Sequence, residues 1–349
     1  MVYNIFMAQN AYSLIERDHL HFKLTPISIR ELLFIQDAPC EILGIENGLF
    51  KPILHKNSFI NKQIIKDLIE KGQIHLFVKL HDRPKLIEYI QNSLTQTTRT
   101  LSLGNPLEKG KLLLNLMTLH LGFLYRNPTD DDLLKVQHQV VKNCAYFLLS
   151  KPEIHEALFH GFVAQKHHYI YAQPIISSLF LLGFLKFSHL YSDKEIEDLF
   201  VTSYFKDIGM AIIPIEKYDL DRLNDRDKVL MNSHPQYSVE LLRGRLALSP
   251  NHLAIVENHH SFSLLKDDFS TEIIGPKSDQ VIAGFETMIV TLMDIMGAML
   301  AGRPYRKASN LFEALDLVKM LIGNQYQQEF RLIVSYFKVL FQNKPPKGE

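Results

Sequence analysis

The second half of the 349-residue chain carries carboxylates and imidazoles that could bind a transition metal. Histidine is abundant, with 16 residues, and imidazole combined with carboxylate is a ligand set suited to transition metals. The candidate ligands stand at four separate places in the sequence: Asp207, His234, the adjacent pair His259 and His260, and Asp294. A metal site therefore requires a fold that brings these four places together.

Each candidate also has an ordinary structural explanation. His234 precedes a proline, which is common at the start of a helix. Neighbouring side chains on a helix point about 100° apart, so His259 and His260 would not simply share one metal, although two adjacent metals would use both. Asp294 is harder to explain this way, because it lies in the apolar segment 287–296 and a buried carboxylate needs a cation or a donor. Taken together, the candidates favour a metal site.

The composition limits the class of protein. Lys plus Arg and Asp plus Glu are 38 each, and this zero balance argues against a general binder of nucleic acid or of membrane surfaces. It leaves room for a local basic pocket. The two cysteines are far apart in sequence and no secretory signal is visible, so we expect a cytoplasmic protein. The apolar segment 281–301 contains Glu286 and Asp294, which favours a buried helix over a membrane span.

The elements that must position the candidates are mostly helices. Residues 20–80 read as a small α+β unit, with a capping box from Ser28 to Glu31 and a hairpin turn at Asn47-Gly48. A helix is predicted over 61–71 and a strand over 74–78. His81 and Asp82 are predicted to lie in a loop, and the polar segment 91–106 is the best candidate for a linker. From residue 107 the pattern is almost continuously helical.

The ordered set of motifs resembles the HD-GYP family, metal-dependent phosphodiesterases of the HD superfamily that hydrolyse cyclic di-GMP. The resemblance rests on Asp207, His234, His259-His260 and Asp294, followed by Arg-Pro-Tyr-Arg-Lys-Ala at 303–308, and it covers residues 107–340. It implies a mainly α protein, with an all-α HD-type helical bundle at 107–345 behind a small α+β regulatory or docking domain at 1–100.

The resemblance also implies a role for each residue. Asp207 would bridge two divalent metals at the catalytic centre, with iron expected and manganese as the alternative. The remaining ligands would be Gln173, at a position where the family has His, together with His234, His259, His260 and Asp294. Arg303 and Arg306 would bind substrate phosphates. Two such cations can activate water and neutralise the charge of a phosphodiester.

The sequence departs from the family at several of these positions. Lys206 replaces the first residue of the His-Asp pair, and Met210 replaces a lysine. No tyrosine stands at the expected place after His260. A lysine is a cation at its usual pKa and cannot bind a metal, so we expect Lys206 either to point away from the site or to pair with an acid. The ligand lost there could be replaced by water, by Gln173, or by a rearranged His167 or His168.

Three functions therefore remain open. The first is a divergent di-metal phosphodiesterase that hydrolyses cyclic di-GMP. The second is a catalytically degenerate signalling module that binds metal, with or without nucleotide, and acts through protein contacts. The third is an HD-type phosphohydrolase with another substrate. The expected partners are cyclic di-GMP or a related nucleotide and signalling proteins, with no nucleic acid and no membrane. The oligomeric state is left open.

Overall fold

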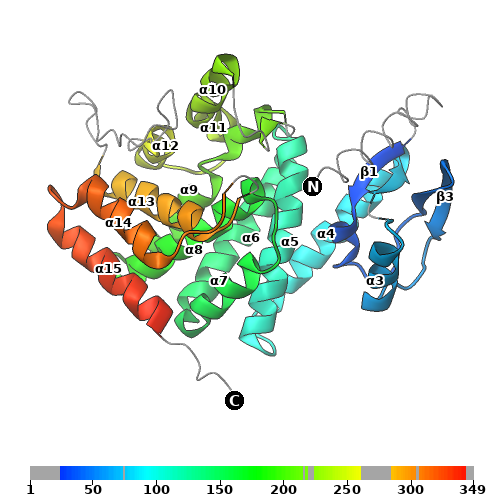
Figure 1. Cartoon of the computed structure of the whole chain (residues 1–349), viewed down its shortest axis with the longest axis horizontal. Helices are drawn as coiled ribbons and strands as arrows, with labels where there is room; N and C mark the ends of the chain where they lie inside the picture. Colours follow the sequence, from blue (N-terminus) through cyan, green and yellow to red (C-terminus); the bar gives the residue numbers. More distant parts are fainter. Residues whose placement is uncertain are drawn as a thin grey trace. The chain divides into compact units, whose positions relative to one another are not determined.

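The computed structural model describes residues 24–73, 75–214, 217–218, 224–260, 284–303 and 306–342. The protein is mainly α, with one small antiparallel sheet (Figure 1). The chain divides into two compact units between Gln96 and Thr97. The first unit contains the sheet, and the second contains all the candidate metal ligands.

The first unit has a four-stranded sheet with the order β1-β4-β2-β3. Its strands are β1 (Leu24–Ser28), β2 (Ile42–Glu46), β3 (Leu49–Leu54) and β4 (His75–Lys79), and its short helices are α2 (Ile29–Leu32) and α3 (Lys62–Glu70). Leu24, Leu43 and Phe77 pack together on it. The predicted capping box begins α2, and Asn47 and Gly48 adopt φ angles of 52° and 76° in the predicted hairpin turn.

Residues 91–99 of the predicted linker are helical, although the boundary between the two units falls within this segment. The short helix η1 (Leu80–Asp82) leads directly into α4 (Arg83–Arg99), which contains this polar segment. Pro84 is tolerated because it lies in the first turn, where its missing N–H needs no partner. Leu86, Ile90 and Leu94 recur every four residues and are all fully buried. This apolar stripe makes the segment a helix despite its polar composition.

The second unit is a helical bundle around α8 (Figure 1). Its helices are α5 (Pro106–Arg126), α6 (Asp131–Leu149), η2 (Pro152–Ile154), α7 (His155–Val163), α8 (Tyr169–Ser188), α9 (Asp193–Phe205), η3 (Ile208–Ile212), α10 (Asp225–Asn232), α11 (His234–Leu242), α12 (Pro250–Asn258), α13 (Gly284–Leu300), α14 (Leu311–Ile322) and α15 (Gln327–Gln342). Helix α8 packs against α5, α6, α7, α9, α13 and α15.

Helix α8 is apolar on all sides, as expected for a helix that is surrounded by other helices. Among the described residues it is the helix that is long and apolar enough to cross a membrane, and 78% of its most apolar window is buried inside the protein. Burial against other helices is what a core helix requires. Helix α13, which covers the apolar segment considered above, is also packed against α8.

A buried polar network joins three helices of this bundle. His120 on α5 is fully buried, and its Nδ1 donates to the Gln137 side chain on α6, 2.5 Å away. The Gln137 amide in turn donates to the Tyr204 hydroxyl on α9, also at 2.5 Å. Burial lowers the pKa of His120 from 6.5 to about 4, and the bond to Gln137 opposes this only in part.

We expect the network to make stability depend on pH. The pKa of His120 is lower in the folded state than in the unfolded state, so the unfolded state takes up the proton first as pH falls. This group's contribution is complete above the unfolded pKa and should decline by ~2 kcal/mol between pH 7 and pH 5. Urea unfolding of His120→Gln should show a correspondingly shallower pH dependence, whereas exposed His160→Gln should keep the wild-type slope. Equal slopes in all three proteins would contradict this assignment.

Candidate metal centre

Four candidate ligands meet at the ends of four helices. Asp207 lies in the turn between α9 and η3, His234 is the first residue of α11, and His259 and His260 follow the end of α12. Their ligand atoms all lie within 4.8 Å of one another. Among the residues that the structure describes, this is the one group of three or more His, Cys, Asp or Glu side chains so arranged.

Backbone carbonyls fix the protonation of two of these imidazoles. The Nδ1 atom of His234 lies 2.6 Å from the Met231 carbonyl oxygen, and Nδ1 of His259 lies 2.6 Å from the Val256 carbonyl oxygen. A carbonyl can only accept, so Nδ1 carries the proton on both rings. In the neutral ring, Nε2 then presents a lone pair.

These lone pairs point at one another and at a carboxylate. Asp207 Oδ1 lies 3.0 Å from His259 Nε2 and 3.2 Å from His234 Nε2. His234 Nε2 also lies 3.3 Å from His259 Nε2 and 3.2 Å from His260 Nε2. Ligands about 2.1 Å from one metal ion stand about 3.0–3.4 Å apart, so the observed spacing fits a single bound cation. Such a cation would satisfy all four acceptors.

The surroundings lower the pKa of two members of this cluster, Asp207 and His260. Burial alone would raise the pKa of Asp207, but the neighbouring Lys206 ammonium outweighs it, so this pKa falls well below its usual range. The pKa of His260 is also well below its usual value, because the ring is desolvated and stands beside the other two imidazoles. A carboxylate and a neutral imidazole are the forms that bind metal.

Lys206 joins this cluster to Asp294. Its side chain is fully buried, and its Nζ contacts Asp207 Oδ2 and lies 2.7 Å from Asp294 Oδ1 on α13. Burial would lower the pKa of Lys206, but the two carboxylates raise it, so the group is an ammonium. The expected pairing of Lys206 with an acid is therefore present, with two acids instead of one.

The remaining predicted site residues lie outside the four-ligand group. Gln173 on α8 donates its amide to Asp294, with Nε2 2.9 Å from Oδ1 and 2.8 Å from the backbone carbonyl. The guanidinium of Arg306 turns back onto the end of α13, where it contacts the Ala298 carbonyl and Met299 Sδ. Arg303 stacks on the Tyr169 ring, 5.0 Å from its centroid.

The proposed replacements for the missing imidazole are engaged elsewhere. His167 Nε2 lies 2.6 Å from the Asn115 side chain, and the His167 ring stacks on Phe162. His168 accepts the Ile170 N–H at the start of α8. Neither belongs to the four-ligand group.

Several residues that the sequence analysis missed hold the ligands in place. The Tyr125 hydroxyl on α5 donates to the Asp207 carbonyl at 2.9 Å, and Thr291 Oγ1 on α13 lies 2.9 Å from the His259 carbonyl. The Gly209 N–H donates to Ser238 Oγ on α11 at 2.8 Å. A side chain at Gly209 would overlap the His234 carbonyl and the Ser238 nitrogen, so glycine lets η3 approach α11 closely. Gly209 lies two residues from Asp207, and Thr291 lies in the apolar segment 287–296, whereas Tyr125 lies near none of the sequence features named above.

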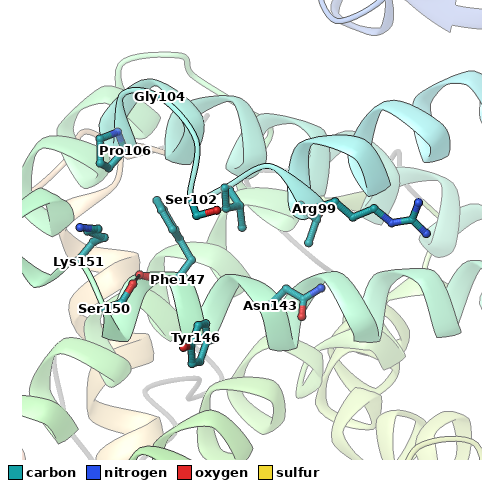
Figure 2. Close-up of a pocket in the computed structure, with 11 residues that line it drawn as sticks. Arg99, Ser102, Gly104, Pro106, Asn143, Tyr146, Phe147, Ser150 and Lys151 are labelled. Carbon is teal, nitrogen blue, oxygen red and sulfur yellow. Dashed lines mark hydrogen bonds between the residues drawn. The ribbon is translucent and has the colours of Figure 1, made fainter.

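A separate cavity of about 530 Å³ lies in the same unit, between the end of α4 with the loop that follows it and helix α6 (Figure 2). Its lining residues are Thr98, Arg99, Leu101, Ser102, Gly104, Pro106, Asn143, Tyr146, Phe147, Ser150 and Lys151. None of the predicted site residues lines it, so the metal centre and this cavity are distinct features.

The described part of the chain is thus a mainly α protein with a cluster of Asp and His side chains at its helix ends. The chain is similar to a solved structure, Bd1817, an HDG"Y"P protein from Bdellovibrio bacteriovorus, with a TM-score of 0.60 and 11% sequence identity. The match covers 90% of this chain and 99% of Bd1817. No protein-family model and no curated protein matches the sequence. At this identity the likeness is one of fold, and it confirms the predicted mainly α fold and the resemblance to HD-GYP proteins.

We expect Gly209→Ala to damage the centre. The new Cβ would push η3 away from α11, which moves Asp207 relative to His234 and should lower the free energy of unfolding by about 3 kcal/mol. Metal affinity should fall as well. Gly122→Ala is the control, because its Cβ would meet no heavy atom closer than 3.9 Å and α5 should gain about 1 kcal/mol. Unfolding and metal titrations would measure both, and an unchanged Gly209→Ala protein would contradict the role of this close approach.

Proposed function

We propose that the chain is a divergent HD-GYP signalling module, cytoplasmic as the sequence predicts, that holds a divalent cation and binds cyclic di-GMP or a related nucleotide. The ligands would be Asp207, His234, His259 and His260. The observation that carries the proposal is the convergence of imidazole Nε2 atoms on the Asp207 carboxylate, since a cation bound between them would stabilise acceptors that face one another. The resemblance to the HD-GYP family favours iron first and manganese second, and imidazole with carboxylate ligands can bind either ion.

The bound cation would supply Lewis acidity and positive charge for a phosphodiester oxygen. The residues of the chain would supply position and further charge. Tyr169 and Gln173 are four residues apart on α8, so both lie on the same face. Arg303 stacks on Tyr169, which supports a role for its guanidinium beside the metal centre as a phosphate ligand. Arg306 is less suited, because its guanidinium already binds the end of α13.

The geometry favours a module that binds the nucleotide without rapidly hydrolysing it. Lys206 already engages both Asp207 and Asp294, which the di-metal mechanism would need as ligands. Met210, where the family has a lysine, offers no charge to a phosphate and is 9% exposed. The module would then act through protein contacts, with the N-terminal unit as a regulatory or docking domain.

Hydrolysis of cyclic di-GMP is the second candidate function. The specific observation in its favour is that the four-ligand group, with a deprotonated Asp207, offers a complete site for one cation. One cation can still polarise a phosphoryl oxygen.

The first test is stabilisation by metal. At a Mn²⁺ concentration about a hundredfold above Kd, the free energy of unfolding should rise by about 2.7 kcal/mol, because the cation binds only the folded chain. His259→Ala should abolish this gain, whereas His160→Ala on the surface of α7 should retain it. Thermal unfolding with and without a chelator measures the difference. Equal stability in both conditions, together with no metal retained by wild-type protein, would refute the metal site.

The second test is nucleotide binding. Calorimetry should detect cyclic di-GMP binding to the metal-loaded protein, and Arg303→Ala should weaken it about tenfold, through loss of a charge-assisted hydrogen bond. Arg331→Ala, at an exposed position on α15, is the matched control and should bind like wild type. Tight binding of another cyclic nucleotide instead would change the ligand but not the class of site.

The third test separates the two candidate functions. If the chain is a phosphodiesterase, metal-loaded protein should convert cyclic di-GMP to the linear dinucleotide, and His260→Ala should eliminate the product. If it is a binding module, product should not form within many hours despite saturating nucleotide. Chromatography of the reaction mixture distinguishes these results.

A further inference from the structure

We propose that the Lys206 ammonium takes the place of a second metal ion, so that the centre holds one divalent cation together with one built-in organic cation. This inference rests on the proposed function in one respect, because it takes Asp207, His234, His259 and His260 as the ligands of the divalent cation. It departs from the two-metal site that the sequence resemblance implies.

The first support is the position of the ammonium. Asp207 presents its two oxygens in two directions, with Oδ1 facing the imidazoles and Oδ2 facing Lys206 Nζ. The same Nζ lies 2.7 Å from Asp294 Oδ1. Lys206 therefore occupies the space between two carboxylates, where a second cation bridged to the first through Asp207 would have to lie.

The second support is burial. The Lys206 side chain is 0% exposed, and those of Asp207 and Asp294 are 13% and 17% exposed. A buried ammonium is stable only when carboxylates surround it, and two buried carboxylates need positive charge between them. A divalent ion in this space would need to lie within contact distance of the ammonium, where repulsion in a medium of low dielectric constant is strong.

The third support is the donor set around Asp294. Gln173 directs its amide nitrogen at Asp294, because both of its partners there are acceptors, the carboxylate Oδ1 and the backbone carbonyl. Asp294 therefore receives hydrogen bonds from an amide and an ammonium. Within the described part of the chain, all the imidazoles that converge on Asp207 belong to the four-ligand group, and Asp294 is not a member of it.

The Lys206 ammonium differs from a second divalent metal ion both in charge and in chemistry. An ammonium carries one positive charge in place of two, donates hydrogen bonds, and has no vacant orbital for a water molecule or a phosphate oxygen. Lys206 can therefore neutralise Asp207 and Asp294 and fix their orientation, but it cannot act as a second Lewis acid. Only the divalent cation at the imidazoles is left to polarise a phosphodiester.

The experiment is a measurement of metal stoichiometry. Full-length protein is loaded with Mn²⁺, freed of excess ion and analysed for metal per chain, with electron paramagnetic resonance as the second readout. Wild-type protein should retain one equivalent with the signal of isolated Mn²⁺. Lys206→His replaces the ammonium with a neutral imidazole that can bind metal, so this variant should retain two equivalents with an exchange-coupled signal.

Asp294→Asn is the control that does not depend on a new ligand. If Asp294 pairs with Lys206 and not with metal, this nearly isosteric variant should still retain one equivalent. Two equivalents in wild-type protein, with a loss of one in Asp294→Asn, would overturn the inference while leaving the proposed metal-binding function intact. One equivalent in a folded Lys206→His variant would also overturn it, because Lys206 would then not be what excludes the second ion.

Complete absence of metal from wild-type protein would overturn both this inference and the proposed function. The wild-type stoichiometry and the Asp294→Asn result decide the matter even if Lys206→His fails to fold. Circular dichroism of each variant establishes whether it has folded.

Discussion

The buried contact of Lys206 with Asp207 and Asp294 is the constraint on which the rest of the centre depends. It joins the end of α9 to the middle of α13, across helix α8 with its Gln173. Each of these charged groups would be costly to bury alone, and each is stable because the others are present. The packing of α8 against α9 and α13 is therefore coupled to the ionic state of the site.

The same contact with Lys206 also orients Asp207 toward the imidazoles. With Oδ2 held by Lys206, the carboxylate directs Oδ1 at the imidazoles of His234 and His259. Carbonyls at the ends of α10 and α12 hold those rings in one tautomer. The candidate ligands are thus preorganised by backbone groups at helix ends, which are rigid, and not by flexible surface side chains.

The likeness of fold does not determine the chemistry of the site, and Lys206 is the residue that illustrates this. The chain shares its fold with Bd1817 over 90% of its length, although the two sequences are only 11% identical. A fold conserved at that level keeps helix ends in place but does not preserve the residues at them. By the resemblance, Lys206 stands where an imidazole is expected, and its ammonium pairs with Asp207 and Asp294 within the helical bundle. This pairing is the reason for proposing a binding module in preference to a di-metal hydrolase.

The sequence alone predicted the fold class and named the four side chains that the structure brings together. Apolar periodicity predicted the helices from residue 107 and Asn47-Gly48 predicted the hairpin, because these signals are local. The order of Asp207, His234, His259 and His260 indicated a metal centre only through its resemblance to a known family, because these residues are far apart in the sequence. The sequence failed at 91–99, where buried Ile90 and Leu94 outweigh polar neighbours. Only the tertiary structure decided where the Lys206 side chain lies, because its partner Asp294 is on another helix. The same holds for the hydrogen bond from Tyr125 to Asp207, because these two residues are too far apart in the sequence for a local pattern to indicate their contact.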